Sequence, residues 1–474
     1  MSPIIDARAR RLRPFWRLAR GRRLAAGLSA LALLGSGCRS QPTQPTSVVV
    51  VVVDTLRADR LGRYGNGKGL TPFLDQLADR GVRFEHAYAP ASWTMPSVAS
   101  LLTSRYPAQH LVSDFDSRLS EREVTIAERL AGAGYANGGF SANFRLSEEL
   151  GYAQGFPTWR RFVDSPGSKT KPRGEVVRAA ALAWLDAAAQ GGAGQGGAGP
   201  APRLLYLQYM EPHAPYEPPA ELRTRFAPGV SAEEAVRLNN RAQSSMVLDQ
   251  DELGHLAALY DAEVAAADAE LRRLFEALEQ RRLLTGALLI VTADHGEEFL
   301  EHGAMGHGTN LFNDTVRVPL IVVGPTVTPG RVVRDNVSLV DLAPTILDVL
   351  GLAPEARFEG HSLAPLLRGG SAAAADVILQ LPRGHFEEDL REHTEGLVRG
   401  TDKLLVDPGG AATLFDLGTD PGERVPQAPP ATAALSAALA TANAALATRQ
   451  QAQAETAPVD EATKEKLRAL GYDL

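Results

Sequence analysis

The 474-residue chain contains a single cysteine, Cys38. Disulfide frameworks and thiolate sites for zinc or iron–sulfur clusters each need several cysteines, so both are excluded. Aromatic residues are also scarce, at 6% of the chain. The 49 lysines and arginines do not outnumber the 56 aspartates and glutamates, and the net charge is −7. Because no basic excess remains to neutralise phosphates, we expect no nucleic-acid partner.

The beginning of the chain has the pattern of a secretory signal peptide. An arginine-rich segment is followed by the apolar run 24–35 and then by small residues that lead to Cys38. The run is shorter than the ~20 apolar residues that span a bilayer. Cys38 lies where bacterial lipoproteins are lipidated, so we predict a lipid anchor on the periplasmic face of a membrane. The alternative is an ordinary signal with an incidental cysteine and a soluble periplasmic or secreted protein.

Continuous apolar runs alternate with helical patterns in the first three quarters of the remaining chain. The runs are typical of strands buried on both faces of a mostly parallel sheet, and they lie at 47–54, 204–209, 287–292 and 318–323. Helical patterns occur at 71–81, 124–134, 175–190 and 255–284. This alternation predicts a layered α/β fold that binds ligands beyond the carboxyl ends of its strands. Short strand patterns after residue 355 predict a small antiparallel sheet, followed by an alanine-rich helix at 431–453.

Two of the predicted loops carry an aspartate and a group of hydroxyls. Asp54 follows the first strand, where a carboxylate is well placed to bind a hard cation. Ser92, Thr94 and Ser97 lie in a turn that leads into an apolar helix. The positive end of a helix dipole favours an alkoxide or an incoming anion at that point. Capping of the turn or helix is the alternative for both loops.

Two further loops carry histidines. His213 lies between prolines in an extended loop, which suits substrate contact or proton transfer, although a solvated surface histidine is the alternative. Asp294 and His295 follow directly on a buried strand and combine a hard oxygen with an imidazole, which predicts a metal pair rather than two solvated loop residues. His302 and His307 lie in the glycine-rich loop that comes next, where the backbone can approach a ligand.

Together these segments resemble the sulfatase family within the alkaline phosphatase superfamily. The resemblance covers about residues 48–474 and rests on the collinear motifs VVVVVVDTLRADRLGRYG, ASWTMPSVASLLTSRYP, YMEPHAPYEPP, TADHGEEFLEHG, GHGTNLFNDTVRVPLIV, NVSLVDLAPTILDVLGL, GHSLAPLLRG, KLLVDPGG, LFDLGTDPGE and LRALGY. It implies an α/β fold with a mixed central sheet between helices and a smaller C-terminal subdomain with an antiparallel sheet. It also implies one or two divalent metals beside a covalent nucleophile.

The resemblance assigns roles to individual residues. The metal ligands would be Asp54, Thr94, Asp294 and His295. Thr94, His213 and His307 would be catalytic, Asn143 would contact the substrate, and Cys38 would carry the lipid.

Several positions depart from the family pattern, and Asn143 and His307 stand where sulfatases usually have lysines. Thr94 stands where sulfatases place a cysteine, occasionally a serine, that is oxidised to formylglycine. Val98 replaces the arginine that supports that residue, and Thr55 replaces the second metal aspartate. Threonine cannot become a formylglycine aldehyde, which points to altered chemistry.

We therefore expect an exported, metal-dependent ester hydrolase or transferase that acts through Thr94 on phospho-esters, such as phosphodiesters or phosphoglycol head groups. A phospho-threonine can be opened by a second in-line attack, whereas a sulfo-threonine resists attack at sulfur. The first alternative is a sulfuric ester hydrolase resembling the arylsulfatases. The second is a catalytically silent lipoprotein that binds an anion.

The expected cofactor is a divalent metal ion. Two carboxylates, a hydroxyl and an imidazole favour Mn²⁺ or Zn²⁺, with Ca²⁺ or Mg²⁺ as alternatives. Asp261 and Asp268 lie in the long helical pattern and are expected to face solvent, so no second set of ligands is assigned. The expected partners are an anionic ester, on a glycan, a lipid head group or a small molecule, and a membrane through the lipid on Cys38.

The sequence patterns and the resemblance together divide the chain into four parts. These are a lipoprotein-type signal peptide (1–37), a polar tether (38–47), a sulfatase-like catalytic domain (48–354) and a C-terminal subdomain with a helical tail (355–474). The signal peptide holds eight arginines and one aspartate, so its removal changes the net charge from −7 to about −14.

Overall fold

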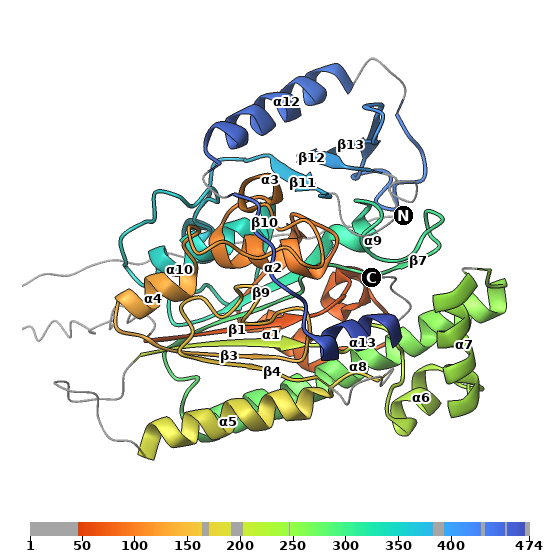
Figure 1. Cartoon of the computed structure of the whole chain (residues 1–474), viewed down its shortest axis with the longest axis horizontal. Coiled ribbons are helices and arrows are strands. Elements are labelled where there is room, and N and C mark those ends of the chain that lie inside the picture. Colours follow the sequence, from red (N-terminus) through yellow and green to blue (C-terminus); the bar gives the residue numbers. More distant parts are fainter. Residues whose placement is uncertain are drawn as a thin grey trace, which may run out of the picture. The chain divides into compact units, whose positions relative to one another are not determined.

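A computed structural model describes residues 46–163, 170–190, 202–245, 247–382, 393–427, 432–450 and 453–469 (Figure 1). The predicted signal peptide, most of the tether and the proposed lipidation site Cys38 lie outside these residues, so those predictions stay predictions. Among the described helices, none is long and apolar enough to cross a membrane. The division of the chain at residues 354 and 355 also stays a prediction.

A mixed eight-stranded sheet forms the centre of the molecule, with strand order β10-β2-β9-β6-β1-β5-β3-β4. Strand β9 runs antiparallel to its neighbours β2 and β6, and the other neighbouring pairs are parallel. The strands are β1 (Ser47–Val53), β2 (Val82–Tyr88), β3 (Ala136–Ser141), β4 (Thr158–Arg161), β5 (Arg203–Tyr209), β6 (Ala287–Thr292), β9 (Arg317–Val323) and β10 (Arg331–Ser338). The predicted α/β fold with a mixed central sheet is confirmed.

Strand β1 lies in the middle of this sheet between β5 and β6. Its six consecutive valines, Val48 to Val53, are all buried, which is the environment that a β-branched run predicts for a strand covered on both faces. Because β5 and β6 are both parallel to β1, the carboxyl ends of three neighbouring strands meet at one edge of the sheet.

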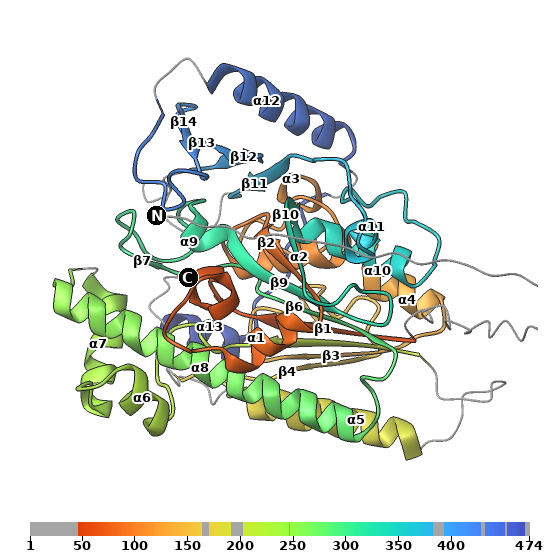
Figure 2. The same ribbon diagram turned by 180° about the vertical axis from the view of Figure 1, so that it is seen from behind.

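Helices cover both faces of the sheet (Figures 1 and 2). The long helices α5 and α8 lie on one face, and α2, α4 and α10 lie on the other. The helices of the main domain are α1 (Pro72–Asp79), α2 (Thr94–Thr103), α3 (Pro107–His110), α4 (Ile126–Gly132), α5 (Gly174–Gln190), α6 (Ala220–Phe226), α7 (Ala232–Ser245), α8 (Gln250–Gln280), α9 (Asn313–Val316), α10 (Leu342–Val349) and α11 (Ala364–Leu367). A short ribbon of β7 (Glu298–Phe299) and β8 (Met305–Gly306) follows β6.

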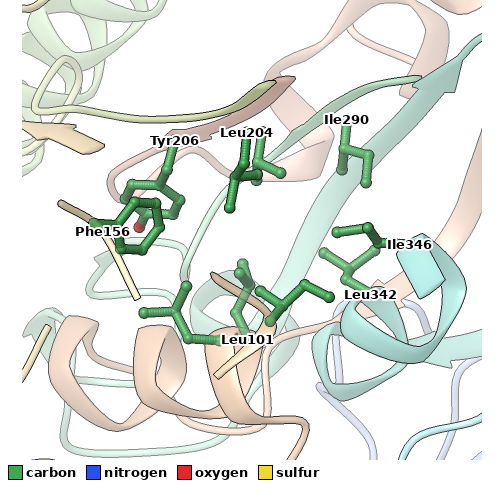
Figure 3. A pocket seen from close by; sticks show the side chains of 10 residues that line it. Leu101, Phe156, Leu204, Tyr206, Ile290, Leu342 and Ile346 are labelled. Atoms are coloured by element: carbon green, nitrogen blue, oxygen red, sulfur yellow. The ribbon is translucent and has the colours of Figure 1, made fainter. Parts of the chain in front are cut away.

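The seam between the sheet and the second helical layer is apolar and tightly packed (Figure 3). Val50, Leu204 and Ile290 of the sheet face Leu101 of α2 and Ile346 of α10. The cavity that remains between them holds only about 10 Å³. Such a space admits at most one water molecule, and its apolar lining offers that water no partners. The seam therefore fixes the position of α2 against the sheet, and α2 carries Thr94.

A second, four-stranded antiparallel sheet follows, with order β11-β12-β13-β14. Its strands are β11 (Val377–Gln380), β12 (Glu395–Arg399), β13 (Asp402–Val406) and β14 (Ala412–Asp416), and helix α12 (Thr432–Thr448) packs on it (Figure 2), while α13 (Glu461–Ala469) comes last. This confirms the predicted small antiparallel sheet and the alanine-rich helix.

A buried ion pair beside the small sheet binds Asn313 of the main domain. Lys403 of β13 and Glu423 are both fully buried, with 2.7 Å between Lys403 Nζ and Glu423 Oε1. Lys403 Nζ also donates to Asn313 Oδ1 at 3.0 Å, and Asn313 N donates to Glu423 Oε2 at 2.6 Å. The small sheet therefore holds the first residue of α9, which lies directly after the loop that contains His307.

The expectation that Asp261 and Asp268 face solvent is wrong, because both are buried in α8. Asp261 pairs with Lys68 at 2.6 Å. Asp268 accepts main-chain N–H groups of Phe73 and Leu74 at 3.0 and 2.8 Å, in the first turn of α1. The two carboxylates thus fix neighbouring segments onto α8. In the described structure, neither of them contacts Asp54, Asp294 or His295.

The pKa of Asp268 makes stability depend on pH. Burial raises that pKa from 3.8 to about 6, although the two N–H donors partly oppose the shift. A folded-state pKa above the unfolded value gives stability that is complete below about pH 4 and is lost as pH rises through 6. Between pH 4.5 and 7.5 we expect the wild type to lose about 2 kcal/mol relative to Asp268→Asn, measured as free energy of unfolding in urea. If the difference in free energy of unfolding between the two proteins stays the same from pH 4.5 to 7.5, the raised pKa of Asp268 is contradicted.

Candidate active site

Polar side chains converge at the carboxyl ends of the central parallel strands. Asp54 follows β1, Asn143 follows β3, and Asp294 and His295 follow β6. Strands β6, β1, β5 and β3 are consecutive neighbours in the sheet, so these ends lie side by side. Thr94 is the first residue of α2 and completes the group. Sites beyond the carboxyl ends of strands are the rule for open α/β sheets.

Asp54, Asp294 and His295 form a candidate metal site. One ligand atom from each residue lies within 4.8 Å of the others, and all three residues are fully buried. Asp54 Oδ1 has no hydrogen-bond partner among the residues that the structure describes. Two adjacent buried carboxylates without a basic partner are unfavourable unless a cation lies between them, so this donor set fits a divalent metal.

His295 is held in the protonation state that a metal needs. Its Nδ1 lies 2.9 Å from the carbonyl oxygen of Gly296, and because a carbonyl only accepts, Nδ1 carries the proton. The lone pair on Nε2 then faces Asp54 Oδ1 at 3.7 Å and Asp294 Oδ2 at 3.8 Å. Burial holds the pKa of His295 well below its ordinary value, so the ring is neutral. Burial and the charge of Asp54 raise the pKa of Asp294.

Thr94 points its hydroxyl into this cluster. Its Oγ1 lies 3.2 Å from His295 Nε2 and 3.5 Å from Asp54 Oδ2. Asn143 Nδ2 donates to Thr94 Oγ1 at 3.3 Å and to Asp54 Oδ2 at 2.6 Å. Thr94 also begins the ten-residue helix α2, whose positive end stabilises an alkoxide or an anion there. The structure thus places the predicted nucleophile among the predicted metal ligands and beside the predicted substrate contact.

His213 and His307 lie against the cluster. The ring centroid of His307 is 4.3 Å from that of His295 and 5.1 Å from that of His213. His213 Nδ1 donates to the carbonyl of Ala214 at 2.5 Å, which leaves Nε2 free to contact a ligand. Burial lowers the pKa of His213. The two rings are therefore close enough to Thr94's neighbours to contact a bound ester.

Glu297 orients His307, and sequence reasoning missed it. Its Oε1 accepts from His307 Nδ1 at 2.8 Å, and its Oε2 accepts from Tyr216 Oη at 3.0 Å. Burial alone would lower the pKa of His307, but the Glu297 carboxylate outweighs burial and raises it. The only signal in the sequence is the position of Glu297, two residues after the Asp294-His295 pair.

Gln208 was also missed. This fully buried residue of β5 donates from Nε2 to Asp294 Oδ2 at 3.0 Å and to Asp54 Oδ2 at 3.4 Å. Tyr206 Oη donates to Gln208 Oε1 at 2.6 Å, which fixes the amide so that its N–H groups face the carboxylates. A glutamine at the end of an apolar strand is the signal that could have found it. Gln208 and Asn143 together hold Asp54 Oδ2 and leave Oδ1 for the metal.

Three other residues named in the sequence analysis do not point into the Asp54–Asp294–His295 cluster. His302 stacks on Phe312, with ring centroids 3.6 Å apart, and pairs with Asp314 at 3.4 Å, so it does not approach the metal residues. Ser97 Oγ donates to the main-chain oxygen of Asp294 at 2.6 Å, which is a structural contact. Thr55 Oγ1 donates to the carbonyl of Asp54 at 2.7 Å, so its hydroxyl is turned away from the carboxylate cluster.

Comparison of the chain with known protein families agrees with the geometry of the site. Residues 46–352 match the family model of the sulfatases. The chain belongs to the sulfatase family. This confirms the resemblance and places the protein in the alkaline phosphatase superfamily, with a metal-dependent site.

Relatives of this sulfatase-family protein share most of its length. Arylsulfatase K of Xenopus laevis is 25% identical over 438 residues, which are 81% of this chain and 79% of the relative. Arylsulfatase A of Homo sapiens is 28% identical over 451 residues, which are 84% of this chain and 86% of the relative. The protein is accordingly a hydrolase of sulfuric or phosphoric esters.

Solved structures share the sulfatase fold. The phosphonate monoester hydrolase of Agrobacterium radiobacter has a TM-score of 0.68 at 22% identity and covers 86% of this chain and 96% of its own. A protein whose structure is in complex with its substrate D-glucosamine-2-N,6-O-disulfate has a TM-score of 0.68 at 18% identity, and the match covers 86% of this chain and 98% of that protein. At these identities the likeness establishes the fold of the sulfatase-family chain, and the chemistry has to be argued from its residues.

Proposed function

We propose that this sulfatase-family protein cleaves phosphodiesters with Thr94 as a covalent nucleophile. The observation that carries the proposal is the position of Thr94 Oγ1, 3.2 Å from His295 Nε2 inside the Asp54–Asp294–His295 cluster. Asn143 also contacts this hydroxyl, and Thr94 is the first residue of α2. The hydroxyl therefore lies between a cation site and a helix N-terminus, which is a suitable position for a nucleophile.

The reaction would proceed in two displacements. Thr94 Oγ1 forms a bond to phosphorus, and the bond to the leaving alcohol breaks, with a proton passing to that alcohol. Water, or an acceptor alcohol, then attacks the same phosphorus, and the bond to Thr94 breaks with return of a proton to its oxygen. When bound, the divalent ion lowers the pKa of the attacking hydroxyl and offsets charge on the phosphoryl oxygens. His213 and His307 contact those oxygens or protonate the leaving alcohol.

The nucleophile itself favours phosphorus over sulfur. A formylglycine hydrate releases sulfate by breaking a bond at its own carbon, and threonine offers no such route. A threonine ester has to be opened by attack on the central atom, which phosphoryl groups tolerate. The phosphonate monoester hydrolase among the structural neighbours is named for a related ester class.

The charges around Thr94 favour a singly charged ester. Among the described residues, the side chains within hydrogen-bonding distance of Thr94 Oγ1 are Asp54, Asn143 and His295, and none of the three carries a permanent positive charge. With two carboxylates facing one divalent ion, little positive charge is left over for a dianionic phosphate monoester. A phosphodiester carries one negative charge, so we expect it to be preferred over a monoester.

Sulfate esters are the second candidate. Their support comes from the relatives, which are named arylsulfatases, and from a structural neighbour whose named substrate is a sulfated sugar. A sulfate monoester also carries a single negative charge, so the charge argument alone does not separate it from a phosphodiester. In either case the substrate is an anionic ester, which a glycan, a lipid head group or a small molecule could carry.

A substrate panel separates the two candidates. Metal-reconstituted protein is assayed with bis(4-nitrophenyl) phosphate, 4-nitrophenyl phosphate and 4-nitrophenyl sulfate, with and without glycerol as acceptor. We expect kcat/KM for the diester to exceed that for the sulfate by at least about 100-fold, or about 2.7 kcal/mol. Faster turnover of the sulfate would favour the second candidate. Turnover of none would favour a silent anion binder, and a glyceryl product would identify a transferase.

We also propose that the protein is exported and anchored to a membrane through a lipid on Cys38, on the periplasmic side. The support is the leader pattern and the acidic body, whose net charge without residues 1–37 is about −14. Release of the protein from membranes on replacement of Cys38 with alanine would support this, and unchanged membrane retention would contradict it.

A further inference from the structure

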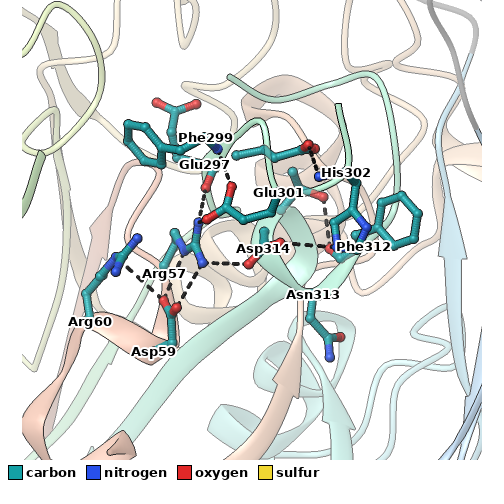
Figure 4. Close-up of polar contacts among 12 residues, drawn as sticks. Arg57, Asp59, Arg60, Glu297, Phe299, Glu301, His302, Phe312, Asn313 and Asp314 are labelled. Carbon is teal, nitrogen blue, oxygen red and sulfur yellow. Dashed lines mark hydrogen bonds and ion pairs between the residues drawn. The ribbon is translucent and has the colours of Figure 1, made fainter. Parts of the chain in front are cut away.

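Arg57 lies three residues after Asp54, and its guanidinium is enclosed by acceptors from three segments (Figure 4). Its side chain is only 5% exposed. Arg57 Nε and Nη2 donate to the two carboxylate oxygens of Asp59 at 2.9 and 2.8 Å. Nη1 donates to Glu301 Oε1 at 2.7 Å, and Nη2 donates to Asp314 Oδ1 at 2.5 Å. One buried cation therefore binds three carboxylates.

The same guanidinium holds the main chain of Glu297. Nη1 donates to the carbonyl oxygen of Glu297 at 2.9 Å. On its other side, Glu297 N donates to the carbonyl oxygen of Asp314 at 2.9 Å. Gly296 packs so closely on α9 that a Cβ there would lie 2.0 Å from Asp314 O. The main chain of Glu297 is thus fixed between Arg57 and α9.

Fixing the main chain of Glu297 also fixes His307, because the Glu297 carboxylate binds His307 Nδ1 at 2.8 Å. Asp54 is held differently. Its N–H donates to the carbonyl of Tyr209 at 2.9 Å, and the strand before it lies in the middle of the sheet. The position of the metal ligand therefore does not depend on the Arg57 side chain, whereas the position of His307 does.

The surroundings of Arg57 suit arginine alone. Five acceptor atoms lie around its plane, and the fork of guanidinium N–H groups reaches them in fixed directions, which a lysine ammonium cannot do. Two further side chains contact the outer carboxylates: Arg60 Nε lies 3.8 Å from Asp59, and His302 Nε2 lies 3.4 Å from Asp314. The glycine-rich loop is thereby tied to the segment after β1.

We propose that Arg57 is the positioning residue of His307: through the main chain of Glu297 it holds the Glu297–His307 pair against the Thr94 cluster. Arg57 contacts neither Thr94 nor the metal residues in the described structure. Its substitution should therefore change turnover while leaving metal binding intact. The proposal rests on the proposed function only for its kinetic readout, because the orientation of His307 can be measured without any substrate.

The matched control is Arg105, a second buried arginine remote from the cluster. Its side chain is 3% exposed and pairs with Glu123 at 3.4 Å and Glu359 at 3.0 Å. Arg105→Gln removes a guanidinium that pairs with two carboxylates, and Arg57→Gln removes one that pairs with three. Loss of stability alone should thus affect both variants, and the thermal unfolding midpoint and bound metal are measured for each.

The substrate-free test is the His307 Nδ1–H resonance in protein labelled with ¹⁵N-histidine, assigned by its absence in His307→Gln. We expect this resonance to vanish or broaden in Arg57→Gln and to persist in Arg105→Gln. An unchanged resonance in a folded Arg57→Gln overturns the proposal. If Arg57→Gln does not fold, Arg57→Lys is measured, with the same two outcomes.

The kinetic test is a double-mutant cycle with His307→Ala. In the protein with His307 intact, we expect Arg57→Gln to lower kcat about 10- to 100-fold with little change in KM. This is the range of loss that a misplaced catalytic group causes. In His307→Ala the same change should cost less than about threefold, because the two residues act as one unit. Equal losses in both backgrounds would overturn the proposal. No activity in the wild type would count against the proposed function and leave the resonance test as the deciding measurement.

Discussion

Replacing Thr94 with alanine is expected to lower kcat/KM for a phosphodiester by about 10⁴-fold or more, equivalent to at least about 5.5 kcal/mol of transition-state stabilisation. The reason is the placement of the Oγ1 atom, which lies among Asp54, Asn143 and His295; in the described part of the chain no other hydroxyl contacts all three groups. Steady-state kinetics with bis(4-nitrophenyl) phosphate measure the loss.

Two variants make this result specific. Thr94→Ser keeps the hydroxyl and should retain activity within about 10- to 100-fold of wild type, because serine loses only the methyl group that restricts the rotamer. Thr103→Ala applies the same substitution in the last turn of α2, where Oγ1 donates to the carbonyl of Ala99 at 2.6 Å. We expect it to leave kcat/KM nearly unchanged. Activity that survives in Thr94→Ala would rule out Thr94 as the nucleophile.

The second large effect concerns the metal. Asp54→Asn removes one of the two carboxylates of the cluster and places an amide where Oδ1 has no partner. Substitutions that only disturb the partners of a metal ligand cost about 10- to 100-fold in affinity, so loss of a ligand should cost more than about 100-fold. We expect activity to fall in parallel, and chelation of the wild type to give the same loss, reversed by Mn²⁺ or Zn²⁺.

Asp341→Asn serves as the control for this prediction. Asp341 is also a buried aspartate, but it accepts from the N–H groups of Ser338 and His361 at 2.9 and 2.8 Å, away from the cluster. We expect the variant to bind metal as the wild type does, measured by inductively coupled plasma mass spectrometry after dialysis. Undiminished metal content in Asp54→Asn would show that the ion is held elsewhere.

The strands that position the site were predictable because they are buried on both faces. Predominantly apolar runs mark β1, β5, β6 and β9. Strand β3 shows no such run, because two glycines interrupt it. The structure gives the reason: a Cβ on Gly138 would lie 2.9 Å from Trp184, and one on Gly139 would lie 2.2 Å from Trp159. Aromatic rings from other segments fill the space that side chains of β3 would otherwise occupy.

The site residues that the sequence did not reveal differ in kind from those that it did reveal. Asp54, Thr94 and His295 come at the ends of strong strand or helix patterns, where topology brings strand ends together. Gln208 and Glu297 act through tertiary contacts instead, on Asp294 and on His307. A pattern along one segment cannot show which distant side chain it will meet. For the same reason α8 looked solvated at Asp268, although the first turn of α1 covers it.

The covalent intermediate tests the central claim most directly. The enzyme is mixed with bis(4-nitrophenyl) phosphate, quenched in acid within milliseconds and digested, and the peptide that contains Thr94 is examined by mass spectrometry. The account predicts a 4-nitrophenyl phosphoryl group on Thr94 that forms and decays at rates consistent with kcat. Turnover at a comparable rate with no modification of Thr94, or with the group on another residue, would contradict it.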